Sequence, residues 1–195
     1  MRTREPSLDH DSLSTSGVRR AFRLHPFAAI LACGFGSGLS PVAPGTAGSA
    51  VALLLAWLLA SLFHPSHGPS LAAGVGLLVS GLVIAAVGVP AATRVARAMS
   101  VKDPGCVVID EFAGQFLASC PVPLFRFETE AARVAAWIVS FLLFRLFDIW
   151  KPGPIHRLQE LPDGLGIVID DVLAGLLAAG GTVVASTLLA GAPWH

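Results

Sequence analysis

Five long apolar stretches, separated by short polar or glycine- and proline-rich connections, dominate the chain after residue 24. They lie at about residues 47–63, 70–90, 106–124, 134–150 and 167–190. A helix that crosses a bilayer needs about 20 residues, within a range of about 17–25. The second stretch fits best, because no charged residue interrupts it. The pattern therefore predicts an all-α fold, a multi-helix integral membrane bundle of about five long apolar helices.

Two segments precede these stretches. Residues 1–24 are polar, lack periodicity and hold five arginines beside three acids, so we expect a disordered polar N-terminal tail. Residues 25–33 are apolar but too short to span, and we expect a short interfacial or re-entrant piece. The domain boundary is therefore predicted at residue 24, with a helical membrane domain over residues 25–195.

Composition agrees with a membrane protein. Apolar residues make up 54% of the chain and charged residues 13%, where a soluble domain carries about a quarter. The formal net charge is zero, which gives no sign of a nucleic-acid partner. No obligate protein partner is evident either, so the lipid bilayer is the expected environment.

The distribution of basic residues predicts the orientation. Cytoplasmic loops carry an excess of lysine and arginine. With a cytoplasmic N-terminus, segments on that side hold ten basic residues, and those on the other side hold two, Arg126 and Arg133. Arg145 lies inside the fourth stretch. The count favours a multi-pass chain with the N-terminus inside and the C-terminus outside.

This topology places five carboxylates at one level, near the cytoplasmic ends of their helices: Asp110, Glu111, Asp148, Asp170 and Asp171. Acids within membrane segments cost about 2.5–3.5 kcal/mol each on insertion scales and usually mark function. Oxygen ligands in such number suit Mg²⁺, so all five are candidate metal ligands. The alternative is helix capping, which does not suit Asp148 at a helix C-terminus.

Two acid pairs occur in similar surroundings. Residues 107–114 read VVIDEFAG and residues 167–175 read IVIDDVLAG, with an Ala-Gly pair about one turn after the acids. Glycine at such positions lets helices approach closely. We therefore expect the third and fifth helices to meet there and to bring the two acid pairs together.

The segment RLFDIWKPGPI, residues 145–155, carries Arg145, Asp148 and Lys151 at a spacing of three. They share roughly one helix face, and Pro152 favours a helix end at Lys151. The two cations are candidates for neutralising the acids or holding a phosphate. A purely structural salt-bridge ladder is the alternative, and both readings are compatible.

The segment GFGSGLSPVAPGTAGS, residues 34–49, is rich in glycine and hydroxyl residues and leads into the first long helix. Such a segment can turn backbone N–H groups toward an anion, although no GK[ST] follows as in a P-loop. A flexible loop is the alternative. The candidate phosphate-binding residues in it are Gly36, Ser37, Gly38, Ser40, Gly45, Thr46 and Ser49.

Four blocks occur in order: GFGSGLSPVAPGTAGS, VIDEFAG, FRLFDIWKPGPI and GLGIVIDDVLAG. Together they resemble the phosphatidylglycerophosphatase A family, from about residue 25 to about residue 190. The resemblance implies an all-helical enzyme of the bacterial inner membrane. It implies Mg²⁺-dependent hydrolysis of phosphatidylglycerophosphate to phosphatidylglycerol at the cytoplasmic leaflet.

The expected mechanism uses Asp148, Glu111, Asp171, Arg145 and Lys151 as catalytic residues. Mg²⁺ activates water and the phosphomonoester, the two cations and the glycine-rich segment stabilise phosphoryl oxygens, and Glu111 or Asp171 serves as general base. Two alternatives are a transporter, whose acids usually lie near the midplane, and a CDP-alcohol phosphotransferase. The arginine and long acid spacing of the latter's pattern are missing after Asp163-Gly164.

Overall fold

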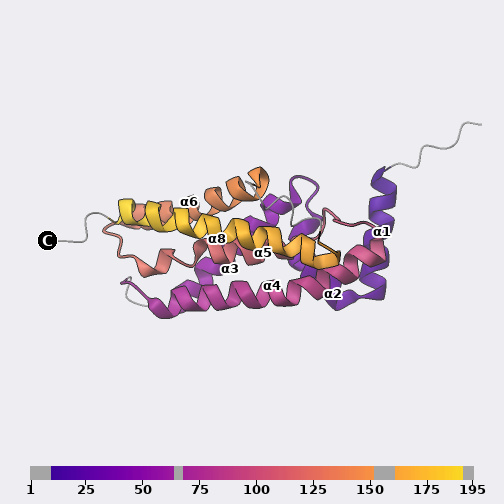
Figure 1. Cartoon of the computed structure of the whole chain (residues 1–195), viewed down its shortest axis with the longest axis horizontal. Coiled ribbons are helices and arrows are strands. Elements are labelled where there is room, and N and C mark those ends of the chain that lie inside the picture. The colour runs from indigo at the N-terminus through magenta and orange to yellow at the C-terminus, as the bar shows by residue number, and fades with distance from the viewer. Residues whose placement is uncertain (1–9, 64–67, 152–160, 191–195) are drawn as a thin grey trace, which may run out of the picture.

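The computed structural model describes residues 10–63, 68–151 and 161–190, and every regular element in these ranges is helical (Figure 1). This confirms the all-α prediction. The elements are α1 (His10–Leu24), α2 (Pro26–Ala32), the 3₁₀ helix η1 (Gly34–Leu39), α3 (Pro44–Leu62), α4 (Leu71–Met99), α5 (Ile109–Ser119), the 3₁₀ helix η2 (Val122–Leu124), α6 (Glu130–Trp150) and α8 (Asp163–Leu189).

Helix α5 is the centre of the bundle. It contacts α3, α4, α6 and α8, and all its residues except Asp110 are buried. The long helices α4 and α8 run along the long axis of the molecule on either side of it (Figure 1). A helix that is buried all round reads as continuously apolar in sequence, which explains the third apolar stretch.

Among the helices of the described ranges, three are long and apolar enough to cross a membrane: α3, α4 and α8. Helix α5 has 11 residues and rises only about 16 Å at 1.5 Å per residue, whereas a hydrocarbon core is about 30 Å thick. The prediction of a spanning helix over 106–124 is therefore wrong. Helix α6 has 21 residues, but Arg133, Arg145 and Asp148 interrupt its apolar sequence, and about five spans are not confirmed.

The N-terminal segment is also more ordered than its sequence suggests. Residues 10–24 form α1, so the prediction of disorder is wrong for this part, and residues 1–9 lie outside the described ranges. Helix α1 packs on α2 and α4. Its contact face includes small residues: Ala21 is 1% exposed, and the backbone at Gly17 lies against the Met99 side chain. Helix α2, with seven residues, is too short to span, as expected.

The close approach of α5 and α8 occurs at the two glycines that follow the acid pairs. A methyl group built on Gly175 would lie 2.8 Å from the Cα atom of Gly114. A methyl group on Gly114 would lie 2.7 Å from the carbonyl oxygen of Asp171. Both distances are below van der Waals contact, and both neighbours are backbone atoms. The predicted glycine-mediated contact between the two helices is confirmed.

We expect Gly175→Ala to lower the free energy of unfolding by about 1–3 kcal/mol, because overpacking forces backbone shifts. Gly180→Ala is the matched control on the same helix, since nothing lies within 4 Å of the added methyl group. It should leave stability unchanged or raise it slightly, because alanine favours helix. Thermal and denaturant unfolding in a mild detergent would measure both, and equal effects would contradict this account of the contact.

Candidate active site

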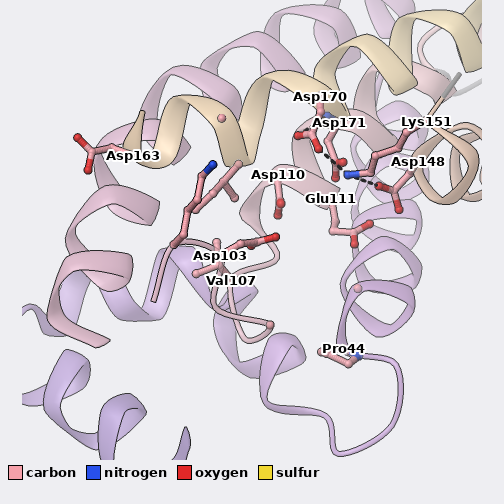
Figure 2. Close-up of a pocket in the computed structure, with 15 residues that line it drawn as sticks. Pro44, Asp103, Val107, Asp110, Glu111, Asp148, Lys151, Asp163, Asp170 and Asp171 are labelled. Carbon is pink, nitrogen blue, oxygen red and sulfur yellow. Dashed lines mark hydrogen bonds and ion pairs between the residues drawn. The ribbon is translucent and has the colours of Figure 1, made fainter. Parts of the chain in front are cut away.

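A cavity of about 440 Å³ opens where α5, α6 and α8 come together, and acids dominate its lining (Figure 2). All five predicted carboxylates line it: Asp110, Glu111, Asp148, Asp170 and Asp171. They come from the start of α5, the end of α6 and the first turns of α8. The prediction that these acids meet in one place is confirmed.

Two of these carboxylates each have one oxygen without a partner. Asp110 Oδ1 and Asp171 Oδ2 are buried, and neither has a hydrogen-bond partner among the described residues. Burying an unpaired charged oxygen is costly, so such an atom calls for an explanation, and a bound cation is one. Figure 2 shows both side chains pointing into the same space.

The other three acids are held by cations. Glu111 Oε2 accepts hydrogen bonds from the Ser49 hydroxyl, at 2.6 Å, and from the Arg145 guanidinium. Arg145 Nη1 also lies 2.6 Å from Asp148 Oδ2. Arg145 is not part of the cavity lining. It sits behind Glu111 and Asp148 and fixes their orientation.

Lys151 completes the set. Its Nζ lies 2.5 Å from Asp170 Oδ2 and 3.7 Å from Asp148 Oδ1. Its backbone is left-handed, with φ 43° and ψ 62°, which ends α6 at the residue predicted from Pro152. Asp148 therefore bridges Arg145 and Lys151, and the salt-bridge ladder is present. Unlike Arg145, Lys151 lines the cavity.

Besides Asp163 at the start of α8, the sequence analysis missed two charged lining residues, Lys102 and Asp103, on the loop between α4 and α5. Figure 2 shows Asp103 directed into the same pocket as Asp110. Partial burial, followed by the negative charge of Asp170, raises the pKa of Asp103 above its usual range. Neither residue falls in an apolar stretch, so intramembrane charge could not reveal them. The signal that the sequence offered was their position on the loop that leads into the first acid pair.

The glycine-rich segment contributes less than expected. Gly45 lines the cavity, and Ser49 reaches it through Glu111. The hydroxyls of Ser37 and Ser40 donate instead to the carbonyls of Gly34 and Val42, both at 2.8 Å. The predicted phosphate-binding residues that do not line the cavity are Gly36, Ser37, Gly38, Ser40, Thr46, Ser49 and Arg145.

A family model described as phosphatidylglycerophosphatase A matches residues 30–186, which contain every residue of the cavity. The chain belongs to the phosphatidylglycerophosphatase A family. The recognition from four sequence blocks is thus confirmed, and members of this family named for their activity are phosphatases. Helix α1 lies outside the matched region.

Curated relatives agree with this membership. The chain is 37% identical to phosphatidylglycerophosphatase A of Escherichia coli K12, over 77% of this chain and 78% of the relative. It is 38% identical to the protein of that name from Haemophilus influenzae Rd, over 76% and 82%. A Bacteroides thetaiotaomicron relative, 34% identical over 75% and 86%, is provisionally named a phosphatidylinositol-3-phosphatase. No solved structure matches the chain.

The family's acids do not form a ready-made metal centre in this structure. Across residues 10–63, 68–151 and 161–190, no group of three or more His, Cys, Asp or Glu side chains is arranged to hold a metal ion. The unpartnered oxygens of Asp110 and Asp171 nevertheless fit a cation, because buried carboxylates need a positive partner. The three remaining acids already have theirs.

We expect Arg145→Met to destabilise the protein strongly, by about 3–5 kcal/mol, because Glu111 and Asp148 would then be buried without their counter-charge. Arg133→Met is the control on the same helix. The Arg133 partner Glu130 is largely exposed, and exposed pairs contribute only about 0–1 kcal/mol. Unfolding in detergent would compare the free energies of unfolding of the two variants. Similar losses of stability would show that the ion pairs of Arg145 stabilise the protein no more than an exposed pair does.

Proposed function

We propose that this protein is a Mg²⁺-dependent phosphatase that hydrolyses phosphatidylglycerophosphate to phosphatidylglycerol and phosphate in phospholipid biosynthesis. One observation carries the proposal. In a member of this family, two buried carboxylate oxygens without partners share a cavity with acids already neutralised by Arg145 and Lys151. A hard cation and a phosphate group are the ligands that such a cavity needs.

Asp110 is the proposed primary Mg²⁺ ligand, and Asp171 shares the cavity with it. Each offers an oxygen that no side chain or backbone amide of the described ranges satisfies, and Mg²⁺ prefers one or two carboxylates together with water and phosphate oxygens. When bound, the ion would polarise the phosphomonoester and make water more acidic. Glu111, Asp148 and Asp170 would contribute to the negative field around it.

The phosphate would lie against the cationic part of the lining. Lys151 and Lys102 both reach the cavity. Gly45 belongs to the first turn of α3, where backbone amides lack intrahelical partners and favour anions. Arg145 would act as a positioning residue through Glu111 and Asp148. In this proposal Lys151, Lys102 and Gly45 stabilise the charge of the phosphate, and Arg145 holds the carboxylates in place from behind.

Asp171 is the stronger candidate for the general base. Of the two residues predicted for this role, Glu111 accepts hydrogen bonds from Ser49 and Arg145 at the same oxygen, which fixes the carboxylate and occupies that oxygen. Asp171 Oδ2 has no such partner. It could accept the proton of an attacking water as the phosphoryl group is transferred.

The proposed location is the bacterial inner membrane, with the active site on the cytoplasmic face. Three apolar helices support membrane association. The basic residues of the sequence gather on the side that holds the start of α5, the end of α6 and the start of α8. The membership of the family favours hydrolysis over the transporter and CDP-alcohol phosphotransferase readings.

We expect Asp171→Asn to lower phosphate release by about 10²–10⁴-fold, the range for loss of a general base. In metal-free buffer the same change should raise the unfolding temperature, because it removes one of several like charges from a buried cluster. The control is Glu130→Gln, which neutralises an acid of α6 that pairs with Arg133 and does not line the cavity. Near-normal turnover of Asp171→Asn would contradict the assignment.

Metal and substrate are tested together by phosphate release from purified protein. We expect phosphatidylglycerophosphate to be hydrolysed with Mg²⁺ present, EDTA to stop the reaction, and added Mg²⁺ to restore it. Mg²⁺ should also raise the unfolding temperature of the wild-type protein, because a ligand that binds only the folded state stabilises it. Asp110→Asn should lose this stabilisation. Full activity in EDTA would overturn the metal proposal.

Phosphatidic acid and phosphatidylinositol-3-phosphate serve as comparison substrates, since one relative carries a phosphoinositide phosphatase name. Both present a phosphomonoester on a lipid, so the cavity chemistry alone does not separate them from phosphatidylglycerophosphate. A clear preference for either comparison lipid would overturn the substrate assignment while leaving the phosphatase class intact.

A further inference from the structure

Helix α1 packs on the bundle with one face and leaves its other face exposed. Ala21 is 1% exposed, Phe22 packs on the main core, and Gly17 lies against Met99 of α4. Figure 1 shows α1 lying across the long axis of the bundle, at the end away from the C-terminus. If the bundle crosses a bilayer along that axis, α1 runs roughly parallel to the membrane plane.

The opposite face of α1 is basic. Arg19, Arg20 and Arg23 are exposed, and residues 10–24 contain a single acid, Asp11. Positions 19 and 23 are one turn apart, so their side chains are neighbours. No ion pair involves these three arginines within the described ranges. Three neighbouring guanidinium groups on a rigid helix form a surface suited to phosphate groups.

Apolar side chains continue directly from this basic face. Leu24 is 49% exposed and Phe27, on α2, is 83% exposed. They line a hollow of about 420 Å³ between α2 and α4, together with Val87 and Arg94. Interfacial helices combine arginines on one face with leucine and phenylalanine that enter the acyl-chain boundary. Both parts of that pattern are present here.

We propose that the basic face of α1 and the adjoining hollow form a docking surface for anionic phospholipids of the surrounding leaflet, with headgroup phosphates on Arg19, Arg20 and Arg23 and acyl chains beside Leu24 and Phe27. Charge complementarity selects this occupant, since anionic leaflets attract basic segments near the membrane. The inference rests on the bundle crossing the bilayer and not on the proposed hydrolysis.

The test uses the purified full chain in nonionic-detergent micelles doped with phosphatidylserine, or with phosphatidylcholine as the zwitterionic reference. Phosphatidylserine carries no phosphomonoester and is not the proposed substrate or product. The readout is the rise in unfolding temperature with the lipid fraction. We expect phosphatidylserine to stabilise the wild-type protein more than phosphatidylcholine, and added salt to reduce the difference.

The double variant Arg19→Gln/Arg23→Gln should need roughly tenfold more phosphatidylserine for half of the stabilisation. Arg19→Lys/Arg23→Lys should retain most of the response, because the charge remains. The control Arg126→Gln/Arg133→Gln removes two cations at the other end of the bundle and should behave as wild type. An equal shift in both glutamine variants, or none in either, would overturn the proposal.

Two further outcomes are decisive. If inorganic phosphate stabilises the wild-type protein as well as phosphatidylserine does, and Arg19→Gln/Arg23→Gln loses that response, the surface binds a soluble anion and the lipid assignment is wrong. If phosphatidylcholine and phosphatidylserine act equally, the arginines have no headgroup role. None of these measurements needs phosphatase activity, so their failure is separable from failure of the proposed function.

Discussion

The site depends on backbone contact between α5 and α8 at Gly114 and Gly175. The two glycines let the helix axes come closer than any side chain would allow, and the acid pairs stand one turn before them. With the helices further apart, Asp110 and Asp171 could not line one cavity. The glycines therefore set the distance between the acids of α5 and those of α8. Arg145 and Lys151 neutralise acids whose positions the backbone has already fixed.

The five acids then divide according to their partners. Arg145 and Lys151 neutralise Glu111, Asp148 and Asp170, which makes the burial of those charges tolerable. Asp110 and Asp171 are left without a counter-charge. Natural proteins retain such unfavourable groups where function needs them. This division explains why one cluster can be both a structural ladder and a candidate metal site.

Much of this arrangement follows from sequence pattern. The acid pairs before Gly114 and Gly175 predict where α5 and α8 meet, and the spacing of three predicts the ladder. The parity of the apolar stretches is not a sound basis for placing the acids, because the helix within the third stretch is too short to span. The sequence could not show which acids are partnered, because that depends on side-chain directions between helices. The sequence also could not distinguish a helix that is apolar because it faces lipid from one that is apolar because protein surrounds it, as is the case for α5. The packing of α1 could not be predicted, because its contact face includes Gly17 and Ala21, which do not produce a periodic pattern of large apolar residues.

The short length of α5 has a mechanical consequence. Bilayer thickness acts on helices that face lipid, and these respond to mismatch by tilting. In this protein that response would fall on α3, α4 and α8, whereas α5 is enclosed by its neighbours. Two of the five acids thus stand on an element that lipid does not touch. A change in membrane thickness would shift these two acids only if α8 moved relative to α5. The contact between the two helices at Gly114 and Gly175 resists that movement, because it joins backbone atoms and no flexible side chain lies between them.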